Sequence, residues 1–328
     1  MLRYTLWRLA LMVPITVLIS MIVFVIIQLP PGDFVTTMTA RMSQQNESVD
    51  PAVLEALRAR YGFDQPVYVQ YWKWVSGILL HGDFGQSFDW NSPVDDLIWD
   101  RLGLTLIVSL ATLLFIWLLA FPIGIYSAIR QYSLGDYIAT FLGFIGLAIP
   151  NFLLALILMW LTTEYLGWSP GGLFSSEYIN AEWSWARVGD LIDHLWIPVI
   201  VLGTGGTASL IRIMRANLLD ELQKPYVEMA RARGLSETRL LLKYPVRVAL
   251  NPFVSTIGWL LPNLVSGAVV TAIVLSLPTS GPLLLNALFA QDMYLAGAII
   301  MLLSILTLIG TLISDLLLAW LDPRVRYE

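Results

Sequence analysis

The sequence has no cysteine and few charged residues. Among its 328 residues, Asp, Glu, Lys and Arg make up 13%, whereas hydrophobic residues make up 57%. Soluble domains usually carry about a quarter charged residues, so a soluble fold would leave too much apolar surface uncovered. The missing cysteine excludes a disulfide scaffold and a cysteine-ligated metal site. The net charge of -5 argues against a nucleic-acid partner. The composition therefore predicts an all-α polytopic membrane protein.

Motifs for catalysis and cofactor binding are scarce as well. The two histidines, His81 and His194, have no metal-ligating or catalytic companions nearby, and we interpret them as surface or interface residues. There is no G-x-x-x-x-G-K-[ST], H-E-x-x-H or G-x-S-x-G pattern. Residues 203–208 match G-x-G-x-x-A, but they fall in an apolar run where close helix packing is the simpler explanation. We expect no catalytic residues, metal or cofactor in this chain.

Long charge-free runs are what the sequence has instead. Crossing about 30 Å of hydrocarbon takes roughly 20 helical residues. The run that starts at Val248 is too long for one span and is broken at Leu277–Pro282, so one helix should end near Ser276. Pro150 and Pro198 should kink or locally unwind two of the spans. The prediction is six transmembrane helices, at Leu9–Gly32, Leu102–Ile129, Tyr137–Thr163, Leu195–Ile211, Val248–Ser276 and Met293–Ser314.

Basic residues predict the orientation of these spans. The first run is longer than a signal-peptide core and has no small-residue cleavage site, so we interpret residues 1–29 as a retained N-terminal anchor helix. With both termini in the cytoplasm, thirteen of the 19 Lys and Arg residues lie on the cytoplasmic side. Asp315, near the inner end of the last span, is interpreted as an interface or packing residue rather than an ion-coupling group.

The outer side holds a long polar segment, residues 30–101. A connection of that length should have structure of its own. We predict one helix from Asp50 to Gly62 and a second from about Pro66 to Leu80, together forming a helical cap on the outer membrane face. Eight of the thirteen tryptophans also lie on the outer side, as expected of an aromatic belt, with stacking on sugar rings as the alternative. The second helix should present one apolar face, formed by Tyr68, Trp72, Val75 and Leu79.

The cytoplasmic counterpart is the segment 212–250. Pro225 should start a helix, Gly234 should end it, and Ser236 can cap a second short helix. Its basic excess is explained in the simplest way by positive-inside bias and contact with lipid headgroups. However, a helix, a glycine corner and a second helix are more than charge bias requires, and we favour a docking surface for a soluble partner.

The motif in this segment resembles a known family. Residues 228–234, Glu-Met-Ala-Arg-Ala-Arg-Gly, are similar to the coupling motif of bacterial ABC importer permeases, in the form found in the dipeptide/oligopeptide/nickel branch. The resemblance covers nearly the whole chain and is to the first of the two permease subunits of that branch. It is carried in order by residues 1–4, 29–33, 61–66, 70–71, 82–87, 149–152, 166–168, 265–268 and 321–326.

The resemblance implies an architecture and a set of partners. It implies a type I importer permease with the outer (periplasmic) cap at 30–101 and a five-helix core at 102–328 that contains the coupling segment 212–250. It also implies a heterodimer with a second permease subunit, two cytosolic subunits that bind ATP and Mg, an extracytoplasmic solute-binding protein, and the cytoplasmic (inner) membrane of a bacterium or archaeon. The residues implied to couple to the ATPase are Glu228, Ala230, Arg231, Ala232, Arg233 and Gly234.

The substrate is left open between two classes. Members of this branch carry peptides, so the resemblance implies import of oligopeptides or dipeptides by alternating access, with oligosaccharides as the alternative. The sequence departs from the family pattern at Ala272, where a Glu is frequent, and at Tyr244-Pro245, which suggests a distinct subgroup. A self-sufficient secondary transporter or a membrane enzyme ranks lower, because the spans contain almost no ionisable groups.

Overall fold

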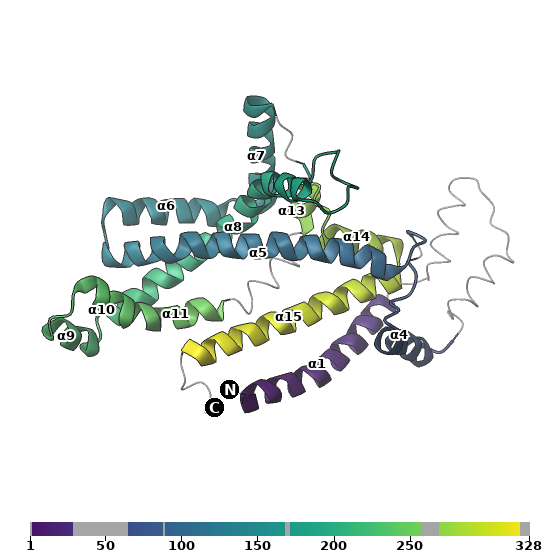
Figure 1. Cartoon of the computed structure of the whole chain (residues 1–328), viewed down its shortest axis with the longest axis horizontal. Coiled ribbons are helices and arrows are strands. Elements are labelled where there is room, and N and C mark those ends of the chain that lie inside the picture. Colours follow the sequence, from purple (N-terminus) through teal and green to yellow (C-terminus); the bar gives the residue numbers. More distant parts are fainter. Residues whose placement is uncertain (1, 29–64, 88, 168–170, 257–268, 322–328) are drawn as a thin grey trace. The chain divides into compact units, whose positions relative to one another are not determined.

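The structure is a computed structural model that describes residues 2–28, 65–87, 89–167, 171–256 and 269–321. Regular structure in these ranges is α-helical, apart from an isolated bridge between Gln86 and Pro93 (Figure 1). The all-α prediction is confirmed for the described residues. The chain divides into two compact units: unit 1 is Met1–Arg8, Thr105–Pro278 and Thr307–Glu328, and unit 2 is Leu9–Leu104 and Thr279–Leu306.

Four described helices are long and apolar enough to cross a membrane. A helix pair, bent by 102°, forms a fifth candidate if the pair is one span. The prediction of six spans therefore finds four or five counterparts in the described ranges. The four single helices are α1 (Leu2–Gln28), α5 (Val94–Ile129), α8 (Trp185–Leu222) and α15 (Met293–Leu321), and the bent pair is α6 (Leu134–Ala148) with α7 (Asn151–Leu166).

Several helices continue beyond the charge-free runs that predicted them. The helix α5 begins at Val94 rather than at Leu102, and its first turn contains Asp95 and Asp96. Acidic residues are favourable there, because the N-terminus of a helix carries partial positive charge. Apolar runs mark the part of a helix that hydrocarbon can surround, so they underestimate helices that extend into polar surroundings.

The region predicted to hold the fifth span is only partly described. Its ends are α11 (Pro245–Ser255) and α13 (Val269–Val274), while residues 257–268 lie outside the described residues. The helix α13 ends close to the predicted end at Ser276, where the backbone adopts φ 52°. A short apolar helix, α14 (Ser280–Ala290), follows and was not predicted as a separate element.

The two prolines predicted to disturb spans behave differently. At Pro150 the chain leaves α6 and turns by 102° into α7, whose N-terminal cap position is Pro150 itself. Residues before proline avoid the helical conformation, and Ile149 accordingly has φ -83° and ψ 121°. Pro198 lies within the continuous helix α8, so the helix is not unwound at that position, and a kink there stays a prediction.

In unit 2, the helix α4 (Val67–His81) matches the second helix predicted for residues 66–80. Gly82, in the left-handed conformation at φ 66°, ends it. The predicted helix Asp50–Gly62 lies outside the described residues. The apolar face predicted for α4 is not its packed face: Tyr68, Trp72 and Leu79 are at least 70% exposed, and Trp74 is buried.

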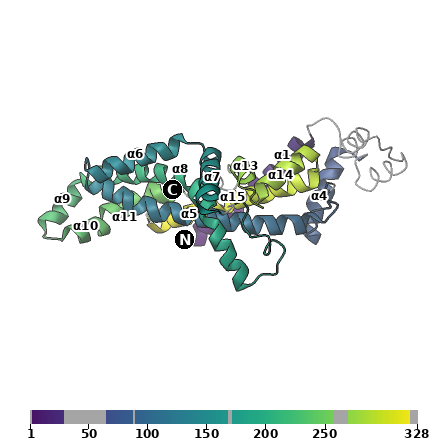
Figure 2. The same ribbon diagram turned by 90° about the horizontal axis from the view of Figure 1, so that it is seen from above.

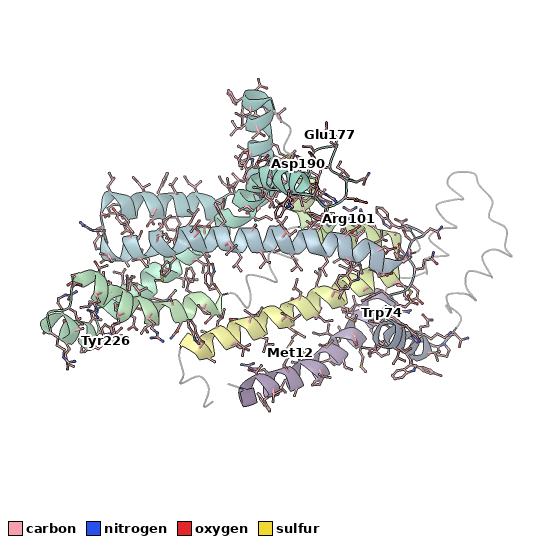
Figure 3. All side chains as sticks on the ribbon, viewed as in Figure 1. Met12, Trp74, Arg101, Glu177, Asp190 and Tyr226 are labelled. Carbon is pink, nitrogen blue, oxygen red and sulfur yellow. The ribbon has the colours of Figure 1, made fainter. Side chains whose placement is uncertain are left out.

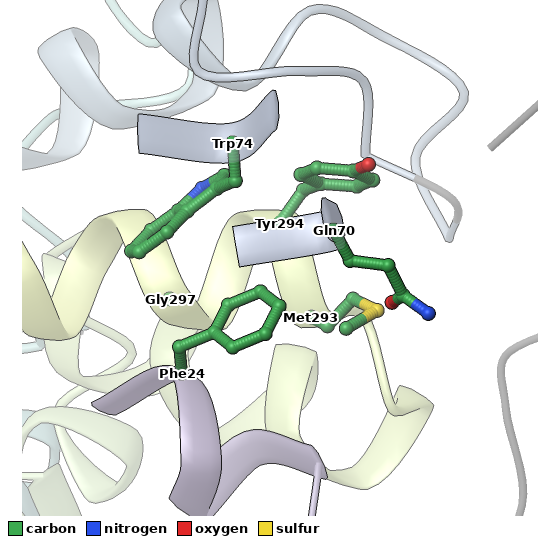
Figure 4. Close-up of a pocket in the computed structure, with 6 residues that line it drawn as sticks. All are labelled: Phe24, Gln70, Trp74, Met293, Tyr294 and Gly297. Atoms are coloured by element: carbon green, nitrogen blue, oxygen red, sulfur yellow. The ribbon is translucent and has the colours of Figure 1, made fainter. Parts of the chain in front are cut away.

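Aromatic contacts hold α4 against α1 within unit 2. Phe24 of α1 lies 5.4 Å from the ring centroid of Tyr71 and 5.8 Å from that of Trp74. The hydroxyl groups of Ser20 and Tyr71 are 2.8 Å apart. A small pocket lies beside this contact, where the start of α15 joins the two helices (Figure 4). Its lining is Phe24, Gln70, Trp74, Met293, Tyr294 and Gly297.

In unit 1, α8 is the central helix. The helices α6 and α11 pack along it, and its C-terminal half contributes Leu210, Met214 and Leu218 to a buried core shared with α5 and α11 (Figures 1 and 2). Gly124 of α5 meets Met214 so closely that an added Cβ would lie 2.7 Å from the Met214 Cβ. This core positions the C-terminal end of α8, from which the candidate site continues.

At the other end of α8, the preceding loop is folded onto the helix. The Arg187 guanidinium lies 4.7 Å from the ring centroid of Phe174 and 4.6 Å from that of Trp183. Asp190, labelled in Figure 3, accepts hydrogen bonds from the backbone N–H (2.8 Å) and the hydroxyl (2.5 Å) of Ser175. These contacts give this loop a defined structure without regular secondary structure.

Candidate functional site: the coupling hairpin

The helix α8 is followed by two short helices, α9 (Pro225–Ala232) and α10 (Glu237–Lys243), which we call the coupling hairpin. The local sequence explains the first corner. Pro225 occupies the first turn of α9, where its missing N–H and fixed φ suit a helix start. The hydroxyl of Tyr226, which is labelled in Figure 3, donates a 2.5 Å hydrogen bond to Glu221 of α8, and this bond braces the corner. Burial, together with the bond to Glu221, raises the pKa of Tyr226.

The second corner is at Gly234. Its φ of 74° lies in the left-handed region, which side chains other than glycine adopt at a cost. An added Cβ would meet no atom within 4 Å, so backbone conformation, rather than space, accounts for glycine here. Ser236 occupies the N-cap position of α10 as the sequence predicts, but its side chain makes no capping hydrogen bond.

A small apolar core lies between the two helices of the hairpin. Val227 and Leu240 are fully buried and Ala230 is 7% exposed. Tyr226, Leu235 and Tyr244 cover this core. The structure thus places Ala230 inside the hairpin, where it allows α9 and α10 to approach each other. Tyr244, one of the departures from the family pattern, completes the same core.

The opposite face of α9 points away from this core. Glu228, Met229, Ala232 and Arg233 are exposed, Met229 at 60%. An alanine beside a flexible methionine suits close contact with a second protein surface, since neither side chain presents an obstructing branch. Of the six residues predicted to couple to an ATPase, five are exposed and only Ala230 is buried.

Arg231 has a partner within the hairpin. Its Nε lies 2.6 Å from a Glu237 carboxylate oxygen, and a second hydrogen bond of 3.3 Å joins the same two side chains. This pair lowers the pKa of Glu237 and raises that of Arg231. Both side chains are more than half exposed, so solvent screens the pair and its contribution to stability is small. It joins α9 to α10 across the Gly234 corner.

Two ion pairs in unit 1 were not predicted from the sequence. Asp136 of α6 pairs with Arg215 of α8, and Arg8 of α1 lies 3.2 Å from Asp315 of α15. The second pair explains the charge of Asp315 as an interhelical contact, in line with the packing interpretation. One signal was available for the first pair. Asp136 precedes one predicted span and Arg215 follows another, both on the predicted cytoplasmic side.

The histidines have different surroundings. His81, at the end of α4, is exposed, whereas His194 is 5% exposed and its Nδ1 lies 2.7 Å from the Asp190 carbonyl oxygen. Among the described residues, no group of three His, Asp or Glu side chains is arranged to hold a metal ion. The exposed face of the hairpin carries the charged groups of Glu228 and Arg233 beside the apolar side chains of Met229 and Ala232.

Comparison with known families agrees with this description. Residues 120–327 match the family described as "Binding-protein-dependent transport system inner membrane component", and residues 1–111 match the N-terminal part described for such membrane components. The chain belongs to this family. The permease is therefore a multi-pass membrane component of a transport system and not an enzyme, which confirms the family inferred from residues 228–234.

Named relatives extend over the whole permease. The oligopeptide transport system permease protein AppB of Bacillus subtilis is 37% identical over 332 residues, covering 100% of both chains. The glutathione transport system permease protein GsiC of Salmonella typhi is 30% identical over 328 residues, again with 100% of both chains covered. The dipeptide transport system permease protein DppB of Escherichia coli is 28% identical over 344 residues with the same coverage.

Proposed function

We propose that this permease is one membrane subunit of an ATP-driven importer that translocates peptides across the inner membrane by alternating access. The observation that carries the proposal is full-length similarity to relatives named as oligopeptide, dipeptide and glutathione permeases. Those names favour peptides over oligosaccharides. Membership in a binding-protein-dependent family also argues against a self-sufficient transporter.

The proposed assembly contains a second permease, two cytosolic ATPase subunits that bind ATP and Mg, and an extracytoplasmic binding protein. Both termini and the coupling hairpin are cytoplasmic in this proposal, and residues 30–101 form the outer cap. Support for the hairpin as the ATPase contact comes from its geometry. The Tyr226–Glu221 hydrogen bond at one corner, the left-handed Gly234 at the other and a buried core support an exposed face of Glu228, Met229, Ala232 and Arg233.

Peptide uptake tests the substrate class. The permease, co-expressed with its second permease and ATPases, is reconstituted into liposomes together with the binding protein. We expect ATP-dependent accumulation of a labelled oligopeptide, inhibited by excess unlabelled peptide and unaffected by an oligosaccharide mixture. Accumulation of labelled oligosaccharide instead would overturn the peptide assignment, and uptake without ATP would overturn the importer assignment.

A bulky side chain on α9 tests the docking face. Ala232→Trp adds bulk to the exposed face without touching the buried core, so we expect the amount of ATPase copurifying with the permease to fall about ten-fold or more, as hot-spot losses at interfaces do. Leu242→Trp is the matched control, because it places the same ring at an exposed position of α10. Equal copurification of ATPase by Ala232→Trp and wild type would refute docking through this face.

A further inference from the structure

Asp136 is the most enclosed carboxylate in the α6–α8 contact. It is 2% exposed, and its two oxygens accept hydrogen bonds from Arg215 Nε (2.9 Å) and an Arg215 terminal nitrogen (2.8 Å). The backbone N–H of Tyr132 donates a further bond of 3.0 Å. The Ser133 side chain accepts from the Asp136 N–H and caps α6. A two-pronged contact of this kind fixes direction as well as distance.

The same two helices touch again further along their length. A Cβ on Gly143 would lie 3.7 Å from the Ala208 Cβ, and a Cβ on Gly146 would lie 2.7 Å from Thr204 Cγ2. Gly143 is seven positions after Asp136, and Ala208 is seven positions before Arg215. At 1.5 Å per residue, both helices advance about 10 Å between these contacts, as antiparallel helices in register must. The contact is therefore continuous from the ion pair to Gly146.

Each end of this helix pair leads to a different element. On α8, Arg215 precedes the start of the coupling hairpin by ten positions, and Tyr226 braces the intervening corner against Glu221. On α6, the helix ends at Ala148 and the chain bends by 102° into α7. A displacement of the hairpin would therefore move α8 and, through the contact between the two helices, α6. The first break in helical structure after α6 is at Ile149–Pro150.

We propose that Asp136 and Arg215 are positioning residues for transport: they fasten α6 to α8, so that the two helices and the coupling hairpin move as one body and the chain flexes at Ile149–Pro150. The proposal rests on the proposed importer function. Sliding of α6 along α8 would leave the Asp136 carboxylate, which is 2% exposed, without its partner, and an unpaired buried charge costs far more than a separated surface pair. The close approach at Gly146 resists tilting of the same helices, because an added Cβ there would lie only 2.7 Å from Thr204 Cγ2.

The first test is the number of peptides transported per ATP hydrolysed in the reconstituted complex. For Asp136→Asn, which keeps the shape and removes the charge, we expect this ratio to fall about ten-fold, within the range of coupling between distant sites. ATPase copurification should stay at the wild-type level. Asp315→Asn is the matched control, because it removes a carboxylate charge from the Arg8 ion pair without touching α6 or α8. An Asp136→Asn ratio equal to wild type would overturn the proposal.

A crosslink provides a second test that leaves Asp136 and Arg215 intact. The chain contains no cysteine, and the 3.7 Å spacing at Gly143 and Ala208 suits a disulfide. In the double variant Gly143→Cys, Ala208→Cys, we expect the transport rates of the oxidised and reduced forms to agree within about two-fold. A disulfide between two helices that do not move relative to each other should not hinder transport. Loss of transport on oxidation, reversed by reduction, would show that α6 slides along α8 and would overturn the proposal.

Combining the two tests separates the proposal from its premise. The crosslink in the Asp136→Asn background should restore most of the lost transport per ATP, since it replaces the missing fastening; no recovery would contradict the positioning role. If the wild-type complex itself shows no ATP-dependent peptide uptake, the proposed function fails. If wild type transports and all the variants match it, the importer assignment stands and the positioning role fails.

Discussion

Ser87 donates a 2.5 Å hydrogen bond to the carboxylate of Asp292, which lies 205 positions later in the sequence. Both residues belong to unit 2, and Asp292 has no solvent exposure. The same carboxylate accepts from the backbone N–H of Leu295 and so caps the start of α15. This contact gives a structural reason for the residue types found at positions 82–87, one of the segments in which the sequence resembles the permease family. Gly82 ends α4, and Gly85, at φ 91°, leaves room for the Tyr294 ring, which an added Cβ would approach to 2.9 Å.

Removing the Ser87 hydroxyl should destabilise unit 2. We expect Ser87→Ala to lower the free energy of unfolding by about 1.5–3 kcal/mol, the contribution typical of a hydrogen bond to a charged group. The Asp292 carboxylate is buried, so water cannot readily take the place of the hydroxyl. Denaturant unfolding in detergent, followed by tryptophan fluorescence, measures the change. Ser92→Ala is the control, because that hydroxyl bonds to the Trp90 carbonyl at an exposed position. Equal losses in both variants would contradict the assignment.

Local signals in the sequence predicted the coupling hairpin well. Proline at a helix start and glycine at a left-handed corner act within a few residues, so Pro225 and Gly234 were sufficient to locate α9 and its end. The role of Ala230 was less accessible. Ala230 is buried because Leu240 folds back onto it across the corner. The linear motif alone does not show that Ala230 is buried and Ala232 is exposed.

Features that depend on distant partners were not predicted. The helix α4 has aromatic residues on both faces, so periodicity alone did not identify Trp74 as the buried one; its burial depends on Phe24 of α1. The Asp136–Arg215 pair joins residues 79 positions apart. Counting charge-free runs treats such residues only as the boundaries of spans, so it does not indicate that Asp136 and Arg215 face each other.

The close spacing of α6 and α8 predicts that alanine is tolerated at Gly143 of α6 but not at Gly146 of the same helix. Gly146→Ala would bring a Cβ to 2.7 Å from Thr204 Cγ2, so we expect a loss of about 1–3 kcal/mol in the free energy of unfolding from overpacking. Gly143→Ala places its Cβ 3.7 Å from Ala208, an ordinary contact, and should be neutral or slightly stabilising because alanine favours helix. The same unfolding measurement compares the two. Greater stability of Gly146→Ala than of Gly143→Ala would show that the helices are not held this closely.

The hydrogen bond between Tyr226 and Glu221 predicts that the Tyr226 hydroxyl titrates at a higher pH than an ordinary tyrosine. Burial, and then the hydrogen bond to Glu221, raises the pKa of Tyr226 above its ordinary value of 10.0. The folded hairpin therefore favours the neutral phenol. The stability it gains is complete below the unfolded-state pKa and is lost as pH rises through the folded-state pKa. The measurement is a pH titration followed by tyrosinate absorbance, in the wild type and in Tyr226→Phe. We expect the difference between the two curves to show one phenol that titrates above the ordinary range.

Glu221→Gln separates the two causes of that shift. The variant removes the negative charge and the carboxylate acceptor but leaves Tyr226 packed beside Val227 and Leu240. Because burial is the larger cause, the pKa of Tyr226 should move part of the way back toward 10.0 and stay above it. A phenol that titrates at the ordinary value in the wild-type permease would mean that the corner between α8 and α9 is open to water. The hairpin would then lack the brace through which α8 is proposed to follow its movement.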